Sequence, residues 1–476
     1  MNMIIFAVEF HHFGFEGEAH LSEKDAQIVE HNFCEHSAAI FGYKDQMHMH
    51  PENTMSSAPN VVVISHRPNY NSSMQRLQAF KYELRPDAAQ QRRMRRFAGS
   101  CRFVFNKALA LQKANYEAGG PFIGYVRMAK HLTAWRHDPQ TPWLSEAPCH
   151  PLQHALRDLE KAYQNFFARR TDFPRFKRKG VGDRLRYPDP KQIKLDQANS
   201  RVFLPKPGWL SYRNSRQVLG EVRNLTVLGQ AGRWFVSIQT QRQVVDPVHS
   251  SQTAIGIDLG VTRFATLSDG SFIAPLNSFK KHRQRLANAQ RAMARKRKFS
   301  NNWRKEKTKV QRIYVRIGNA RRDFLHKTST TISQNHAIVC LEDLRVLDMS
   351  RSAAGSADTP GRNVRAKSGL NRGILDQGWG EFRRQLEYNQ AWRGGQVLAV
   401  PPRNTSRSCP ICTHVSAHNR LNQTRFSCVN CGFEQNADVV GALNVLAAEH
   451  AVLACGGTVR MGRPVKQEPA EVSQAA

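Results

Sequence analysis

Residues 254–274 read AIGIDLGVTRFATLSDGSFIA, and this stretch decides how the second half of the chain folds. Short apolar runs are separated by Gly260 and by Asp269–Gly270, which predicts three short strands joined by tight turns in an antiparallel meander. Asp258 ends the first strand. Gly256 lies two residues before it and Gly260 two residues after it. Many folds hold an acid at a strand end, so Asp258 alone indicates either a structural residue or a metal ligand.

A second apolar run, HAIVCLEDL at 336–344, predicts a buried strand that carries another candidate carboxylate. An acid that follows five apolar strand residues costs free energy unless it faces a metal or a polar partner. Strand alternation sends Glu342 and Asp343 to opposite faces. We therefore take Glu342 as the candidate ligand and expect Asp343 to cap or to face solvent. The competing interpretation is that Glu342 simply marks the strand end.

The segment FEQNADVVGALNVLAAEH, residues 433–450, predicts an amphipathic helix with Asp438 in its first turn. A carboxylate there also benefits from the helix dipole, so N-capping is the competing interpretation. Together with Asp258 and Glu342 it gives three acids on a first strand, a later strand and a C-terminal helix, as in the RNase H-like fold. Such a set suits two Mg²⁺ ions about 4 Å apart that hydrolyse a phosphodiester.

The apolar run QVLAVPP, residues 396–402, predicts another strand. Two CxxC knuckles follow it, Cys409-Pro-Ile-Cys412 and Cys428-Val-Asn-Cys431, separated by fifteen residues. This spacing is typical of a zinc ribbon, in which four thiolates form a tetrahedral cage. Four protein ligands leave no open position, which indicates a structural rather than a catalytic Zn²⁺. Nine cysteines in 476 residues form no disulfide framework, so the pattern also indicates a reducing compartment.

The formal net charge is +32, from 70 Lys and Arg against 38 Asp and Glu. A field of this size selects polyanions, with nucleic acid the first candidate and an acidic membrane surface the second. The longest apolar run is the six residues Met3–Val8, far below the roughly 20 that span a bilayer. The first residues, MNMIIFAVEFHH, lack the basic segment of a signal peptide. We therefore expect a cytoplasmic, nucleoid-associated protein with no membrane partner.

Charge separates the beginning of the chain from the rest. Residues 1–73 hold three basic and nine acidic residues, a net charge of −6, so the remainder carries +38. We interpret them as an appendage, with Met74 as the functional start. Their His48-Met49-His50 formally matches the HxH of HUH nucleases but lacks a convincing strand around it. At the other end, residues 456–476 lack periodicity and are expected to be disordered.

The remaining chain predicts a multidomain α+β protein. Residues 74–86 and 190–248 show strand patterns between Gly, Pro and Asn, which predicts a small β-barrel. Residues 87–189 show mainly helical spacing and would be an insertion into that barrel. Residues 249–455 are expected to form the RNase H-like α/β domain, with the zinc ribbon inserted at 408–432.

Two basic segments are candidates for nucleic-acid contact. Residues 279–327 hold 18 Lys and Arg against two acids, and Asn301–Asn302 predicts two helices with a break. This imbalance favours contact with a duplex backbone over a merely solvated face. The block YQNFFARRTDFPRFKRKG, residues 163–180, would add stacking or phosphate contact, although its Phe166 and Phe167 fit a core equally well. The candidate contacts are Arg291, Arg295, Lys296, Arg297, Lys298, Arg175 and Lys177.

The chain from about Met74 to Cys455 resembles the TnpB (OrfB) family of transposon-encoded RNA-guided nucleases, relatives of type V CRISPR effectors. The resemblance rests on phrases in the family's order: LQAFKYELRPDAAQ, RFVFNKALA, FPRFKRKG, GIDLGVTRFATLSDG, VCLEDL, KSGLNRGILDQGWGEFRRQLEY, PPRNTSRSCPIC and CVNCGFEQNADVVGALNVL. One departure is local. Many members have Asn-Ala two residues after the last acid, where this chain has Val440-Gly441.

The resemblance implies an RNA-guided endonuclease that cuts double-stranded DNA beside a short flanking motif. Its guide RNA would come from the transposon end. Asp258, Glu342 and Asp438 would be the RuvC-type triad that holds two catalytic Mg²⁺ ions, and the four knuckle cysteines would bind Zn²⁺. The barrel would be the wedge domain and the helical insertion the recognition domain. The alternatives are an RNA-guided DNA-binding repressor or accessory transposition protein that does not cleave, and an autonomous cut-and-paste transposase that needs no guide RNA.

Overall fold

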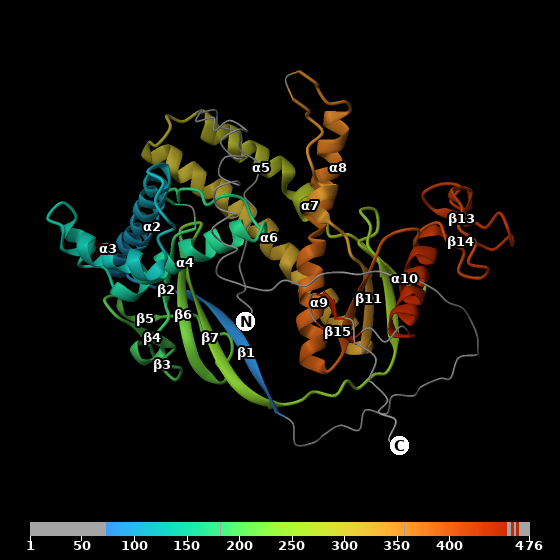
Figure 1. Ribbon diagram of the computed structural model, residues 1–476, viewed down its shortest axis with the longest axis horizontal. Coiled ribbons are helices and arrows are strands. Elements are labelled where there is room, and N and C mark those ends of the chain that lie inside the picture. Colours follow the sequence, from blue (N-terminus) through green and yellow to red (C-terminus); the bar gives the residue numbers. More distant parts are fainter. Residues whose placement is uncertain (1–72, 181, 357, 455–457, 461–462, 466–476) are drawn as a thin grey trace, which may run out of the picture. The chain divides into compact units, whose positions relative to one another are not determined.

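The computed structural model describes residues 73–180, 182–356, 358–454, 458–460 and 463–465 (Figure 1). The predicted appendage, apart from Ser73, lies outside the described residues, and so does its HxH motif. Within the described ranges, no helix combines the length and the apolarity that crossing a bilayer requires.

An antiparallel sheet of order β1-β7-β6-β2 begins the described chain. β1 (Ser73–Leu84) pairs along its whole length with β7 (Arg233–Val245), which confirms the predicted pairing of the first strand with the later β segment. β6 (Glu221–Gln230) lies between β7 and β2 (Arg184–Tyr187). The strand β2 corrects the expectation that residues 87–189 are helical, because it falls inside that range.

A second antiparallel sheet consists of β3 (Lys194–Asp196), β4 (Arg201–Leu204) and β5 (Gly208–Ser211). It meets the first sheet through a bridge between Leu84 and Tyr212. Apolar side chains of both sheets belong to one buried core. The segments expected to form a barrel are therefore arranged as two sheets that share a core and join at this bridge.

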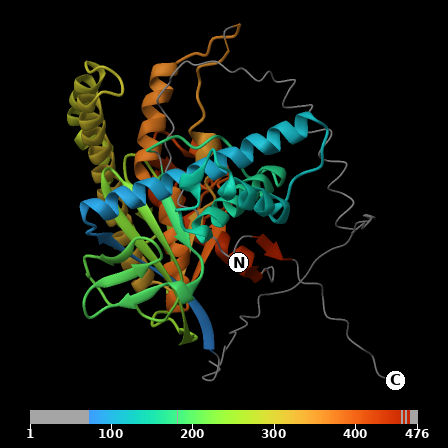
Figure 2. The same ribbon diagram turned by 90° about the vertical axis from the view of Figure 1, so that its left-hand side faces the viewer.

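Three helices lie in the chain between β1 and β2: α2 (Ala88–Glu117), α3 (Tyr125–His137) and α4 (Cys149–Phe167). α2 begins with a capping box, in which the side chains of Asp87 and Gln90 each accept a backbone N–H from the other residue. α2 packs against α4, and both contact β2, so the helices close the core of the sheets (Figure 2).

A five-stranded mixed sheet of order β10-β9-β8-β11-β12 forms the centre of the second half. β8 (Ala254–Asp258), β9 (Ala265–Leu267) and β10 (Phe272–Ile273) are the predicted antiparallel meander. β11 (Ile338–Glu342) pairs in parallel with β8 and with β12 (Gln396–Val400). The three middle residues of β8 and of β11 are buried, as expected for parallel strands covered on both faces.

A long helical hairpin connects β10 to β11. It consists of α5 (Ser278–Ala294) and α6 (Asn301–Asn335) and confirms the predicted break (Figure 1). The hydroxyl of Ser300 caps α6 by accepting the N–H of Trp303. The two helices pack through a small apolar cluster that contains Leu286, Val310, Ile313 and Ile317.

α7 (Val346–Met349), α8 (Val364–Gln377) and α9 (Trp379–Arg393) follow β11. The segment WGEFRRQLEYNQAWRGG, whose apolar spacing predicts an amphipathic helix, forms α9. Gly378 separates α8 from α9 because its φ of +75° is left-handed, which glycine adopts without strain. The carboxylate of Asp376 in α8 accepts the backbone N–H of Phe279 and thereby caps the start of α5.

The zinc-ribbon segment lies in the chain between β12 and the helix α10 (Ala437–Ala454). It contains the paired strands β13 (Arg425–Ser427) and β14 (Glu434–Asn436). α10 contacts β8 and β11 and covers one face of the mixed sheet. The helix was predicted from its apolar periodicity, and it carries Asp438 in its first turn as expected.

A few short elements complete the described chain: η1 (Pro142–Leu144), η2 (Pro190–Gln192), η3 (Ala417–Asn419), β15 (Thr458–Arg460) and β16 (Arg463–Val465). β15 and β16 pair with each other inside the range 456–476, for which disorder was expected. The other residues of that range lie outside the described part of the chain.

Candidate active site and zinc site

Asp258 and Glu342 end two neighbouring parallel strands. Ile257 of β8 lies opposite Leu341 of β11, so the residues that follow them leave the sheet at the same edge. Both acids are half-buried. The structure therefore brings two of the three predicted acids together, because parallel strands in register present their carboxyl ends on one side.

α10 supplies the third acid because two glycines let it approach β8 closely. A Cβ at Gly256 would lie 2.1 Å from the carbonyl oxygen of Ala442, a distance that no real contact tolerates. A Cβ at Gly441 would lie 3.2 Å from Cγ of Asp258. The first turn of α10 is thus held beside the end of β8, where the charge of Asp438 acts on Asp258.

Capping does not explain Asp438. Its backbone N–H donates to Oδ1 of Asn436 at 3.0 Å, so Asn436 is the N-cap of α10. The N-cap interpretation of Asp438 is therefore wrong. Among the described residues, the Asp438 carboxylate is half-buried and has no hydrogen-bond partner or ion-pair partner. It is left available for a ligand.

The three acids share one electrostatic environment. Burial raises the pKa of Asp258 to about 7, and the charges of Glu342 and Asp438 add to that rise. Burial also raises the pKa of Glu342. The positive charge of Arg420, in the ribbon segment, opposes the rise at Asp258. Mutual repulsion of this kind is relieved when a divalent cation binds.

Glu342 is held by a loop that the sequence analysis missed. Oγ1 of Thr405 donates to Oε1 of Glu342 at 2.6 Å. Nδ2 of Asn444 in α10 donates to the carbonyl oxygens of Thr405 and Ser408, at 2.7 Å and 2.8 Å. Ser408 directly precedes the zinc-ribbon cysteine Cys409. The loop therefore connects the first knuckle, the last helix and the strand-end acid.

Asp343 turns away from this site, as alternation predicted. It is exposed, and its carboxylate pairs with Arg383 of α9. Its backbone N–H donates to the carbonyl oxygen of Val400 at 2.8 Å and so extends the ladder to β12. Asp343 is consequently a natural control for substitutions of Glu342.

The four knuckle cysteines converge. Sγ of Cys409 lies 3.6 Å from that of Cys431, and Sγ of Cys412 lies 3.5 Å from that of Cys428. A tetrahedral zinc with Zn–S bonds of about 2.3 Å needs sulfurs about 3.8 Å apart. Backbone N–H of His414 and the side chain of Asn430 lower the pKa of Cys412 to about 6, which favours the thiolate. The four thiols thus fit a structural zinc ion.

The carboxylates have a wider spacing than the thiols. Over the described ranges, the four cysteines are the one group of three or more such ligands whose donor atoms all lie within 4.8 Å of one another. Asp258, Glu342 and Asp438 do not form such a group. A wider arrangement is what two ions about 4 Å apart would need.

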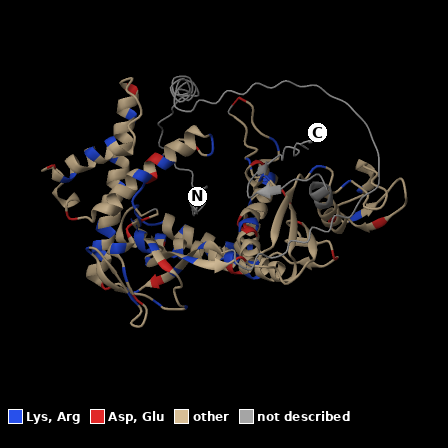
Figure 3. Cartoon of the chain, turned by 60° about the horizontal axis from the view of Figure 1, so that its bottom comes forward, with Lys and Arg blue, Asp and Glu red and all other residues tan. Residues whose placement is uncertain are grey.

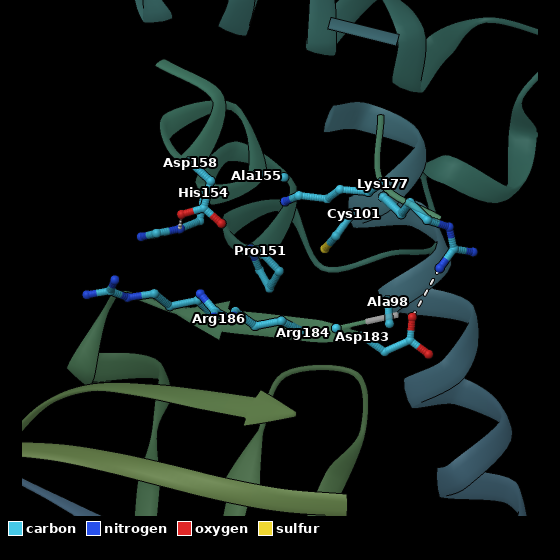
Figure 4. A pocket seen from close by; sticks show the side chains of 12 residues that line it. Ala98, Cys101, Pro151, His154, Ala155, Asp158, Lys177, Asp183, Arg184 and Arg186 are labelled. Atoms are coloured by element: carbon cyan, nitrogen blue, oxygen red, sulfur yellow. Dashed lines mark hydrogen bonds and ion pairs between the residues drawn. The ribbon is translucent and has the colours of Figure 1, made fainter. Parts of the chain in front are cut away.

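The predicted nucleic-acid contacts occupy two places. Arg291 in α5 and the four basic residues 295–298 in the turn before α6 are exposed. Arg175 is also exposed and pairs with Asp172 at 3.2 Å. Lys177 is exposed as well, and its ammonium group is directed toward a small pocket (Figure 4). Figure 3 shows Lys and Arg distributed over helices, strands and loops of the described chain.

Three segments match known families. Residues 236–353, which contain Asp258 and Glu342, match OrfB_IS605, described as "Probable transposase". Residues 379–445, which contain the ribbon and Asp438, match the Cas12f1-like TNB domain. Residues 74–121 match the helix-turn-helix domain of OrfB_IS605. In this structure that last segment consists of β1 and the single long helix α2.

Relatives cover most of the chain. "Putative RNA-guided DNA endonuclease InsQ" of Escherichia coli (strain K12) is 58% identical over 402 residues, 84% of this chain and 100% of the relative. "Putative RNA-guided DNA endonuclease" of Streptomyces pristinaespiralis is 35% identical over 407 residues, which are 82% of this chain and 96% of the relative. A Cas12f1-sgRNA-target DNA complex aligns with 11% identity and a TM-score of 0.46, over 78% of this chain and 98% of that one. The identity and coverage of the E. coli and Streptomyces relatives show that the chain belongs to the TnpB (OrfB) family.

Proposed function

We propose that this chain is an RNA-guided DNA endonuclease that cleaves double-stranded DNA next to a short flanking motif. The observation that carries the proposal is the meeting of Asp258, Glu342 and Asp438 at one edge of the mixed sheet, in a chain with a net charge of +32. Two full-length relatives carry names for this activity. The strand order, with a meander followed by two parallel strands and a covering helix, supports assignment of residues 249–455 as an RNase H-like (RuvC) domain.

The three acids suit a pair of Mg²⁺ ions, since carboxylate oxygens are the ligands that this ion prefers. When bound, two such ions activate a water for attack on the phosphodiester and stabilise the leaving oxygen. The chain's own residues prepare the site. Thr405 orients Glu342, Gly441 leaves room for the Asp258 carboxylate, and Arg420 adds positive charge near the acids. The ribbon would hold a structural Zn²⁺.

The other parts of the chain would hold the nucleic acids. We assign the two joined sheets as the wedge domain and α2, α3 and α4 as the recognition domain, which together would bind a guide RNA from the transposon end. The exposed basic turn at 295–298 would contact the backbone of the guide–target duplex, whose shape rather than sequence a protein reads.

The test is cleavage of a plasmid with a matched target and a randomised flank, by the full chain co-expressed with RNA from its transposon end. We expect RNA-dependent linearisation in Mg²⁺ that is lost in EDTA. Glu342→Gln and Asp258→Ala should abolish cutting while binding persists. Asp343→Asn is the matched control and should cut normally, because Asp343 faces Arg383.

Two outcomes would support other functions. Binding without cutting by the unsubstituted protein would favour a guided repressor or an accessory transposition protein. Cutting that needs no RNA would favour an autonomous transposase. Loss of binding together with cutting in Asp258→Ala would contradict a metal-ligand role for Asp258, since removal of one carboxylate should spare the basic contacts.

A further inference from the structure

A small pocket lies away from the proposed active site, between α2, α4, β2 and the loop that follows α4 (Figure 4). Its volume is about 40 Å³, which exceeds the space that one water needs and leaves room for a small ionic group. Its charged lining residues are Arg102, Asp158, Lys177, Asp183, Arg184 and Arg186. Four cations thus face two carboxylates.

Each carboxylate has one close partner, but only Arg102 carries a permanent charge. Arg102 pairs with Asp183 at 3.1 Å, and His154 pairs with Asp158 at 3.3 Å. Lys177, Arg184 and Arg186 have no carboxylate within ion-pair distance in the described part of the chain. The charge of Asp158 also acts on Lys177 and Arg186. Four cations against two carboxylates leave a net charge of +2 in a partly enclosed space, which favours an anion.

Lys177 is fixed in this position by its backbone. Its N–H donates to Oδ1 of Asn106 at 2.8 Å, and its carbonyl oxygen accepts from Nδ2 of Asn106 at 3.0 Å. Its ammonium nitrogen lies 3.7 Å from the centre of the Phe105 ring. Figure 4 shows the side chain reaching into the pocket toward Ala155 and Asp158. These contacts hold Lys177 beside the pocket, although the residue as a whole is exposed.

Two further features of the cations favour an anion here. Burial, with the charge of Arg184 added, lowers the pKa of Lys177, so its ammonium group is only partly stabilised by Asp158. Nε of Arg186 is buried and has no hydrogen-bond partner among the described residues. A buried donor without an acceptor is unfavourable, and an oxyanion would satisfy it.

We propose that this pocket binds one backbone phosphate of a nucleic acid, held by the half-buried Arg186 and by the exposed Lys177 and Arg184. The inference rests on the proposed function for its source of phosphate, which is either the guide RNA or the target DNA. Hydrogen bonds from guanidinium and ammonium groups to phosphate oxygens are charge-assisted and strong. The pocket would fix the register of one strand against α2 without reading its sequence.

The test is the salt dependence of binding, measured with the full chain and two labelled probes, a single-stranded RNA and a DNA duplex. Loss of one phosphate contact lowers the slope of log K against log salt by about 0.9 for a duplex and about 0.7 for a single strand. We expect Lys177→Gln and Arg184→Gln each to show such a loss with one of the probes. The probe that responds identifies the source of the phosphate.

Two control variants separate the site from general damage. Arg102→Gln combined with Asp183→Asn removes the ion pair without changing the pocket's net charge and should keep the full slope. Lys177→Arg keeps the positive charge and should also keep the full salt slope. Because Arg184 is exposed, Arg184→Gln should fold normally, and its thermal unfolding can be compared directly with that of the unsubstituted protein.

Unchanged salt slopes for Lys177→Gln and Arg184→Gln with both probes would contradict the proposed phosphate site. An equal loss of slope in the Arg102→Gln, Asp183→Asn control would contradict it too. Cleavage is measured separately, so the two proposals can fail independently. If the protein cuts under RNA guidance but the slopes are unchanged, only the phosphate-site proposal is contradicted. If the slopes fall but the protein never cuts, only the proposed function is contradicted.

Discussion

Asp258 is the residue whose chemistry is most altered by its surroundings. Burial and the charges of Glu342 and Asp438 move its pKa from 3.8 to about 7. The folded chain without a metal therefore keeps a proton there that the unfolded chain has already lost near pH 4. A bound divalent cation must displace that proton, because only the carboxylate is a ligand.

This displacement gives a pH prediction. Below about pH 7, addition of Mg²⁺ should release protons, and the release should disappear at higher pH, where Asp258 is already ionised. The same sign means that the unfolding free energy of the metal-free protein falls as pH rises from about 4 to about 7, and then levels off. Calorimetry in buffers of different ionisation enthalpy measures the protons. Asp258→Asn should reduce both effects to the part that Glu342 contributes, because burial raises the pKa of Glu342 as well. An unchanged release in that variant would contradict the assignment.

At the scale of elements, close packing of α10 on β8 is what completes the site. It depends on Gly256, where a Cβ would meet the backbone of Ala442 at 2.1 Å, and less on Gly441, where the contact would be 3.2 Å from Cγ of Asp258. Backbone cannot move aside as a side chain can, so the two positions should tolerate a methyl group very differently.

We therefore predict that Gly256→Ala displaces α10, lowers the unfolding free energy by about 1–3 kcal/mol and abolishes cleavage. Gly441→Ala is the matched variant and should stay folded, since only a small shift of the Asp258 side chain is needed. Thermal unfolding and plasmid cleavage check both. Equal behaviour of the two variants would show that the helix–strand contact is not limiting.

The loop between β12 and the ribbon is the second element that matters, because Thr405 holds Glu342. Removal of a group that orients a metal ligand typically costs about 10–100-fold in metal affinity or activity. Thr405→Val should produce a loss of that size, measured as the Mn²⁺ concentration needed for binding and for cutting. Thr405→Ser keeps the hydroxyl and should recover most of it. A valine variant with unchanged metal affinity would contradict the positioning role.

At the scale of the whole molecule, hydrogen bonds of one loop connect the ribbon to the acidic site. Asn444 of α10 binds the carbonyl oxygens of Thr405 and Ser408, and Ser408 adjoins the first zinc-ribbon cysteine. A change in the knuckle should therefore reach Glu342 through four residues of loop. The ribbon is in this sense part of the support of the active site.

Loss of zinc should consequently weaken the acidic site as well as the ribbon. We expect Cys409→Ser to lower zinc content, and to lower Mn²⁺ affinity at the acids even at temperatures where circular dichroism shows the rest of the chain folded. Val429→Ala, an exposed ribbon position between the second pair of cysteines, is the control and should change neither quantity. Full Mn²⁺ affinity in a zinc-free, folded protein would exclude the connection.

Much of this arrangement was predictable, for identifiable reasons. Three kinds of local pattern carried the prediction: apolar runs that end in Asp258 and Glu342, the helical spacing around Asp438 and the spacing of four cysteines. The structure has the strands β8 and β11 and the helix α10 at the predicted positions. The residues that were missed act over long distances in sequence. Thr405 lies 63 residues from Glu342, and its partner Asn444 lies 39 residues further on. β2 and α8 were missed because four strand residues and a glycine-containing helix carry little periodic signal.

The position of α10 behind the ribbon sets an order of assembly during protein synthesis. Asp258 and Glu342 leave the ribosome first, then the cysteines, and Asp438 last of the proposed ligands. Chains fold from the N-terminus as they emerge, so a nascent or prematurely terminated chain holds the strand-end acids without their third partner. Such a chain would lack a complete set of ligands, and the host's DNA would meet a competent nuclease only after translation had passed the ribbon.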